Sequence, residues 1–346
     1  PAPSYESRNW IFEILGAIGP KKAAPENEST SRQFRAASLI MQNYSSTDVA
    51  VLVLELIPAA AFGLAGQHVA GVAGRWSRTL RIVLPVLLVL PYVWISYSHQ
   101  MFLWRWAALY AAMPVAIAGL LDRAAAADPE QRGNWRDAIV LLVLGVAVDL
   151  RWLEGLWPRG LAGLGKLLLV DAGLYGFVVM RQLRGTGFDF HLRWRDWKTG
   201  LRELVLFAPV VIALGLALRF LHPHTNVPRP SMILTWVYIF IFIAVPEELF
   251  FRAWVQNLLE KRIGFWLESR DDPRAPHMAR IMALAITSIL FGLSHFNKRS
   301  PTFNWRYVIL ATIAGIFYGR AWRRNRRVTA SAITHASVDA IWSLWF

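Results

Sequence analysis

The sequence contains no cysteine and few charged residues, and each shortage excludes a class of protein. Without cysteine the chain has no disulfide, no thiolate nucleophile, no cysteine-bound zinc and no site for S-acylation. Charged residues account for 17% of the 346 positions, whereas an average soluble domain has roughly a quarter. Hydrophobic residues account for 55%, and the mean hydropathy is +0.35. This balance excludes an ordinary soluble domain and predicts a protein of the lipid bilayer.

Long apolar runs alternate with short basic connectors along most of the chain. A helix needs roughly 20 apolar residues to cross the hydrocarbon core, and its backbone polar groups must be satisfied internally there. The sequence therefore predicts an all-α fold, a polytopic transmembrane helical bundle of about ten membrane segments (about eight to ten). These lie near residues 48–66, 80–98, 102–121, 137–150, 160–180, 203–220, 231–260, 278–296, 305–321 and 328–345.

The net charge of +14 comes from lysines and arginines that sit in the connectors between the apolar runs. This distribution is typical of topology signals and of contact with lipid headgroups, so no nucleic-acid partner is expected. The connectors after the odd-numbered segments are the more basic, and they are predicted to be cytoplasmic. With ten crossings, both termini lie outside. The densest connector, 320–327, contains Arg320, Arg323, Arg324, Arg326 and Arg327.

Three parts of the chain are predicted from composition. Residues 1–40 form a polar N-terminal tail without the pattern of a cleaved signal peptide. Residues 41–202 contain the N-terminal membrane helices without a recognisable motif, and a basic, tryptophan-rich segment over 181–202 that is expected at the membrane surface. Residues 203–346 form a C-terminal helical core. The expected location is a bacterial inner (cytoplasmic) membrane, as a multi-pass protein.

The seventh segment contains ionisable side chains, which are costly inside a membrane and mark functional sites. In the sequence IFIAVPEELFFRAW, Glu248 and Arg252 are four residues apart on one helix face, where we expect an ion pair. Glu247 is about 100° round the helix from Glu248, which leaves its carboxylate facing elsewhere. Pro246 is expected to interrupt the helical hydrogen bonds just before it. Two adjacent carboxylates with one local arginine indicate a functional site.

Two histidines, His295 and His335, lie well inside apolar runs, and the other six fall in or beside connectors. His295 follows Phe291 by four residues and His335 precedes Asp339 by four, so each pair shares a helix face. At about 1.5 Å per residue from the nearest basic residue, Glu247 and His295 reach similar depths, and His335 can meet them. We therefore expect one cluster near mid-membrane that is reached from the cytoplasmic side.

The chemistry of this cluster matches peptide hydrolysis. A carboxylate and a histidine can hold and deprotonate a water in a dry cavity, and a second polar pair can stabilise the oxyanion. The sequence has no HExxH motif of the zinc class, and Gly185–Asp189 has one residue too many for the Gly-x-Gly-Asp motif of the aspartyl class. Ser294 and His295 are about 100° apart on a helix, so they are not expected to form a serine–histidine dyad.

Three motifs occur in order on successive hydrophobic helices: EELFFR at Glu247–Arg252, FGLSH at Phe291–His295 and HASVD at His335–Asp339. They resemble the EExxxR, FxxxH and Hxxx(Asn/Asp) motifs of the CAAX protease and bacteriocin-processing (CPBP) family. The resemblance covers roughly residues 231–346. It implies a glutamate-dependent, metal-free intramembrane endopeptidase with no cofactor. Its substrate would be a peptide or protein, membrane-anchored or lipidated substrates included.

The resemblance also implies roles for individual residues. The catalytic set is Glu247 and His295, which would activate water, and His335 and Asp339, which would form the oxyanion site; the supporting set is Glu248, Arg252 and Phe291. One position departs from the CAAX-processing members, which have asparagine where this chain has Asp339. An ionised aspartate cannot donate a hydrogen bond, so the oxyanion role of this position is open.

Two other functions remain compatible with the same residues. The first is a metal-dependent membrane hydrolase, because Glu247, His295, His335 and Asp339 are all acceptable zinc ligands. The second is a non-catalytic immunity or scaffold protein that keeps the cluster for packing.

Overall fold

The computed structural model describes residues 44–346, apart from 151–152, 159–160, 162, 224–230 and 297–302. Within this part of the chain every regular element is a helix, and each of the ten predicted segments corresponds to helical structure. The polar tail predicted over 1–40 lies outside the described residues. The all-α prediction is confirmed.

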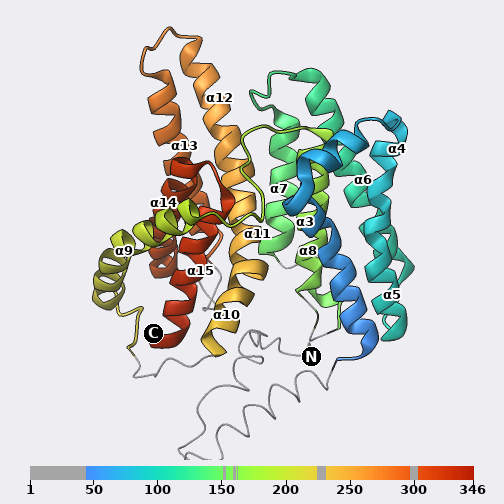
Figure 1. Cartoon of the computed structure of the whole chain (residues 1–346), viewed down its shortest axis with the longest axis horizontal. Helices are drawn as coiled ribbons and strands as arrows, with labels where there is room; N and C mark the ends of the chain where they lie inside the picture. Colours follow the sequence, from blue (N-terminus) through green and yellow to red (C-terminus); the bar gives the residue numbers. More distant parts are fainter. Residues whose placement is uncertain (1–43, 151–152, 159–160, 162, 224–230, 297–302) are drawn as a thin grey trace, which may run out of the picture.

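The first helices of the chain form one group, shown in blue and green in Figure 1. They are α3 (Ser46–Ala73), α4 (Arg78–Val83), the 3₁₀ helix η1 (Leu84–Val89), α5 (Leu90–Ser98), α6 (Trp104–Ala127), α7 (Trp135–Asp149), the 3₁₀ helix η2 (Glu154–Leu156), α8 (Leu164–Leu174) and the π-helix η4 (Tyr175–Met180).

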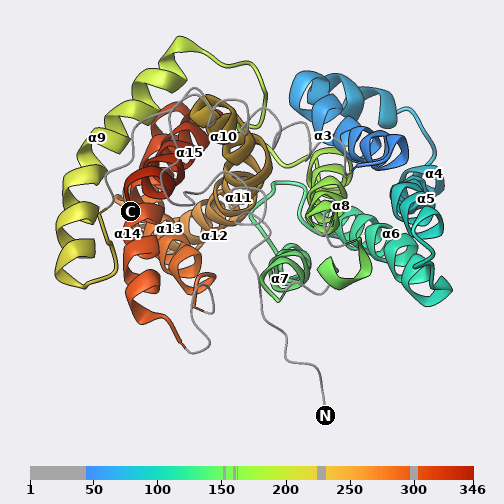
Figure 2. The same cartoon turned by 90° about the horizontal axis from the view of Figure 1, so that it is seen from below.

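The remaining helices form a second group beside the first, as both Figure 1 and Figure 2 show. They are α9 (Trp194–Ala217), α10 (Ser231–Ile239), the π-helix η5 (Phe240–Ala244), α11 (Val245–Glu248), the π-helix η6 (Leu249–Gln256), α12 (Asn257–Glu268), α13 (Ala275–Leu293), α14 (Trp305–Asn325) and α15 (Val328–Trp345).

Six helical stretches in the described residues are long and apolar enough to cross a membrane: Ser46–Ala73, Arg78–Ser98, Trp104–Ala127, Trp194–Ala217, Met232–Glu268 and Ala275–Leu293. Large apolar side chains point away from the protein on these helices, such as Leu234, which is 72% exposed, and Val205, which is 69% exposed. Exposing such an apolar surface to water is unfavourable, whereas contact with lipid is not. The chain is therefore a multi-pass helical membrane protein, and crossing by the other predicted segments stays a prediction.

The seventh predicted segment is a single long helix that carries Glu247 and Glu248. It is continuous from Met232 to Glu268, and Pro246, which was expected to interrupt its hydrogen bonds, lies within it. Two π-helical stretches, η5 before Pro246 and η6 after Glu248, loosen the turns on either side of the proline. Such π-helical turns occur frequently at functional sites.

This long helix also joins the two groups of helices. The Trp254 ring on η6 stacks on Phe177 of η4, with 4.9 Å between ring centroids. It lies so close to Gly173 of α8 that a Cβ there would be 2.8 Å from the Trp254 Cζ3 atom. Because only glycine leaves this space, the N-terminal group fixes the position of the helix that bears the glutamates.

The segment that connects the two groups of helices is shorter than predicted. The basic segment 181–202 was expected to lie at the membrane surface before the next helix, but α9 already begins at Trp194. The proposed boundary at 203 therefore falls inside α9, and the three-part division of the chain stays a prediction. Only residues 181–193 form the connection.

This connection holds the start of α15, the helix that carries His335. The backbone N–H of Val328 donates to the Gly187 carbonyl at 2.8 Å, and Gly187 has a φ of +66°. The Arg327 guanidinium donates to Asp189 and, at 2.8 Å, to Asp196. Burial alone would raise the pKa of Asp189, but hydrogen bonding and the charge of Arg327 outweigh it and hold that pKa below its ordinary value.

Candidate active site

Glu248 is the structural centre of the polar cluster. Its side chain is fully buried and accepts a hydrogen bond from Arg252 Nε at 2.8 Å. The same carboxylate contacts the Ser331 hydroxyl, and its other oxygen lies 2.9 Å from His335 Nδ1. The predicted pairing of Glu248 with Arg252 is confirmed. With these three neighbours, Glu248 joins the long helix to α15.

His335 is surrounded by carboxylates from two helices. Glu248 holds its Nδ1 atom, whereas Nε2 lies 3.9 Å from Glu247 Oε2 and 3.6 Å from Asp339 Oδ2. The His335 side chain is only 4% exposed, but those of Glu247 and Asp339 are 28% and 31% exposed. Both separations exceed a direct hydrogen bond. The Nε2 side of the ring therefore faces two partly exposed carboxylates.

His295 lies beyond the last turn of α13 and reaches the cluster through an aromatic ring. Phe291 has its ring centroid 4.9 Å from that of His295 and 5.7 Å from that of His335. Arg252 also lies against the same ring, at 5.4 Å from its centroid. The structure thus brings Glu247 and Asp339 close to His335, and the Phe291 ring contacts both His295 and His335.

The geometry of Ser294 corrects one sequence argument. Ser294 Oγ lies 3.2 Å from His295 Nδ1, although the two were expected to point apart. The helical spacing does not apply here because α13 ends at Leu293. Ser294 Oγ and His295 Nδ1 also lie 2.9 and 2.8 Å from the Phe291 carbonyl, to which each can donate. A Nδ1 atom that donates its proton cannot accept one from serine, so the pair lacks the arrangement of a serine–histidine dyad.

Several residues of the site were missed by sequence reasoning. The Tyr318 ring of α14 stacks on His335, with 4.6 Å between centroids and 16° between planes. Ser331 precedes His335 by one helical turn, so its contact with the cluster could have been found from spacing alone. Gln256 lies one turn after Arg252, with its Oε1 atom 3.4 Å from Arg252 Nη1. Tyr318 had no such signal, because its place depends on how α14 packs on α15.

Comparison with known proteins identifies the C-terminal part of the chain. Residues 229–341 match the family model described as type II CAAX prenyl endopeptidase Rce1-like. Searches of curated proteins and of solved structures find no match. The matched residues include every member of the cluster around Glu248 and His335. The resemblance seen in the three sequence motifs is confirmed by this match, which makes residues 229–341 of this membrane protein similar to the Rce1-like family of CAAX proteases.

Proposed function

We propose that this protein is an intramembrane endopeptidase that hydrolyses a peptide bond with water activated by Glu247. The observation that carries the proposal is the buried His335 ring, whose Nε2 atom faces Glu247 and Asp339 while Glu248 holds Nδ1. The Rce1-like match supports protease chemistry in this region. We further propose that the site opens to the cytoplasmic side, because the densest cluster of arginines lies at the end of α14.

The surroundings of the two glutamates assign different roles to them. Glu248 already contacts Arg252, Ser331 and His335, so its carboxylate is committed to holding the site together. Glu247 is partly exposed, and its oxygen is 3.9 Å from His335 Nε2, a separation that suits a bridging water. Glu247 is therefore the base that takes the proton from this water as the water attacks the peptide carbonyl. The resemblance gives His295 a share in this step.

The oxyanion formed by that attack needs a donor, and His335 can supply one. When protonated, its Nε2–H group can donate to the oxyanion, while Nδ1–H donates to Glu248. Asp339, 3.6 Å from Nε2, stabilises the charged ring rather than donating to the oxyanion itself. This role would explain how an aspartate can function at the position where the CAAX-processing members have asparagine.

Substitution of Asp339 tests that assignment. We expect Asp339→Asn to keep substantial activity. The fall in its rate on the alkaline side of the pH–rate profile should move to lower pH, because His335 then has one fewer carboxylate beside it and loses its proton more easily. Asp339→Ala removes both the charge and the polar atom beside His335 Nε2, so we expect His335 to be lost as the oxyanion donor and the rate to fall by about 10²–10³-fold. The measurement is a pH–rate profile of the three proteins. Identical profiles for wild type and Asp339→Asn would instead make position 339 a neutral donor.

The reaction itself can be tested without a known substrate. We expect peptidomics of membranes with and without the active chain to reveal peptides that appear only with it, cut near the cytoplasmic ends of membrane segments. The substrate class we propose is a membrane-anchored or lipidated peptide or protein. Cut sites on the opposite side would contradict the cytoplasmic opening, and the absence of any difference would favour the immunity or scaffold hypothesis.

Metal dependence is a separate hypothesis for the same residues. Glu247, His295, His335 and Asp339 include the nitrogen and oxygen donors that zinc accepts. In the part of the chain that the structure describes, no group of three or more His, Cys, Asp or Glu side chains is arranged to hold a metal ion. Total metal in purified active protein, measured before and after a chelator, distinguishes a metalloenzyme from the glutamate mechanism.

A further inference from the structure

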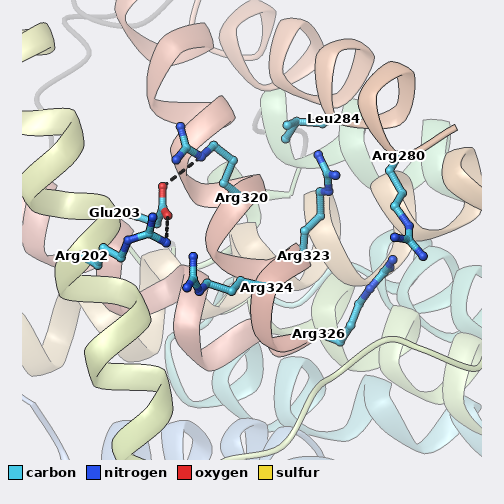
Figure 3. Close-up of a pocket in the computed structure, with 8 residues that line it drawn as sticks. All are labelled: Arg202, Glu203, Arg280, Leu284, Arg320, Arg323, Arg324 and Arg326. Carbon is cyan, nitrogen blue, oxygen red and sulfur yellow. Dashed lines mark ion pairs between the residues drawn. The ribbon is translucent and has the colours of Figure 1, made fainter. Parts of the chain in front are cut away.

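A basic cavity lies between α9, α13 and α14 (Figure 3), and no residue of the cluster around His335 is in its lining. Its volume is about 570 Å³. Six of its lining residues are arginines, and the others are one carboxylate and one apolar residue. The lining is Arg202, Glu203, Arg280, Leu284, Arg320, Arg323, Arg324 and Arg326.

Two carboxylates balance part of this charge. Glu203, whose side chain is 2% exposed, lies 3.1 Å from Arg320 Nε and 3.5 Å from Arg202 Nη1. Glu260 of α12, outside the lining, pairs with Arg326 and lies 3.5 Å from Arg280 Nε. Four arginines therefore share two carboxylates, and the cavity keeps an excess of positive charge even before the other two are considered.

Arg323 and Arg324 complete this excess. Among the described residues, no ion pair joins either of them to a carboxylate, whereas Arg320 and Arg326 on the same helix are paired. Arg323 is half-buried and Arg324 is exposed. Like charges packed around one cavity repel each other, and a bound anion would relieve that repulsion. Arginine guanidinium groups match the geometry of phosphate oxygens, because two parallel N–H groups can donate to one phosphate.

The surroundings of the cavity point to a ligand at the membrane surface. Four of the five arginines in the connector 320–327, which is predicted to face the cytoplasm, line the cavity. Next to two of its arginines, Leu201 and Ile281 expose 43% and 42% of their surface. An anion carrying acyl chains could therefore place its phosphate among the arginines and its chains against these apolar residues. Basic pockets between membrane helices are known to hold anionic lipid headgroups.

We propose that this arginine-lined cavity is a binding site for a phosphate-bearing anion, supplied by the headgroup of an anionic phospholipid. The site is separate from the protease chemistry proposed above, so it stands whether or not Glu247 acts as the base. Inorganic phosphate has the same chemistry without the acyl chains, and the experiment distinguishes the two sources.

The test uses the full chain, purified in a neutral detergent and freed of native lipid. Dioctanoyl phosphatidylglycerol, dioctanoyl phosphatidylcholine and inorganic phosphate are each titrated, and binding is read from the melting temperature and from calorimetry. The pocket variant is Arg323→Gln with Arg324→Gln. The matched control is Arg75→Gln with Arg262→Gln, which removes the same charge from exposed arginines that do not line the cavity.

We expect phosphatidylglycerol to bind the wild type and the control alike, and to bind the pocket variant about ten-fold more weakly or worse, since two charged hydrogen-bonding groups are lost. Phosphatidylcholine should bind more weakly than phosphatidylglycerol to the wild type. Inorganic phosphate that binds as tightly as phosphatidylglycerol would assign the cavity to a soluble phosphate. Equal lipid and phosphate binding by the pocket and control variants would overturn the proposal and leave the arginines as topology signals.

Discussion

Replacing Glu247 by glutamine is expected to lower the cleavage rate by about 10²–10⁴-fold, the contribution of a positioned general base. Glutamine keeps the volume of the side chain but cannot take a proton from water. The fold should be unaffected, because the Glu247 side chain is partly exposed and its Oε2 atom lies 3.9 Å from His335 Nε2, beyond a direct hydrogen bond. The measurement is turnover of a substrate found by peptidomics, together with the melting temperature of each protein.

A matched control for this variant exists on the same long helix. Glu268 is exposed at the end of α12, so Glu268→Gln makes the same chemical change far from His335 and should leave turnover and melting temperature unchanged. A Glu247→Gln protein that turns over near the wild-type rate would show that another group activates the water. His295 would then be the first residue to test in its place.

Replacing Arg252 by alanine is expected to destabilise the protein by about 3–5 kcal/mol, the usual cost of removing one partner from a buried ion pair. Arg252 and Glu248 are both fully buried, and 2.8 Å separates Arg252 Nε from Glu248 Oε2. Without the arginine, the Glu248 carboxylate stays buried with Ser331 and His335 as its remaining partners. The measurement is the free energy of unfolding of the full chain in mixed micelles.

Two further variants separate loss of the pair from loss of a side chain. Arg262 is exposed on α12, and Arg262→Ala should change the free energy of unfolding little, as most surface substitutions do. Combining Glu248→Gln with Arg252→Gln should cost less than the sum of the two single changes, because each single change leaves a buried charge unpaired. Single changes that add without coupling would mean that the pair does not stabilise the fold.

Local spacing explains what could be predicted of the site. The pairing of Glu248 with Arg252, and the shared face of His335 and Asp339, both follow from residues four apart on a helix. The helical segments followed from hydrophobic length, because a bilayer leaves the backbone few alternatives. These features depend on residues close in the sequence or on the lipid environment, so they can be predicted from a single sequence.

Contacts between helices explain what could not be predicted. The contacts of the Tyr318 and Phe291 rings with His335, and of the Trp254 ring with Gly173, depend on how helices pack against each other. The arginine cavity is similar, since its lining combines residues of α9 with residues of α13 and α14, which come much later in the chain. The approach of Ser294 to His295 was misjudged because the regular helix ends one residue earlier.

Residues in the connection between the two groups of helices, outside the stretch that matches the family model, help to position the site inside it. The family match begins at residue 229, yet the start of α15 is held by Gly187, Asp189 and Asp196, all outside it. The Trp254 ring likewise packs against Gly173, where a side chain would collide with it. A change at a residue before 229 can therefore alter the position of His335 without touching the three sequence motifs. The part of the chain that positions the site is therefore longer than the stretch that the family model matches.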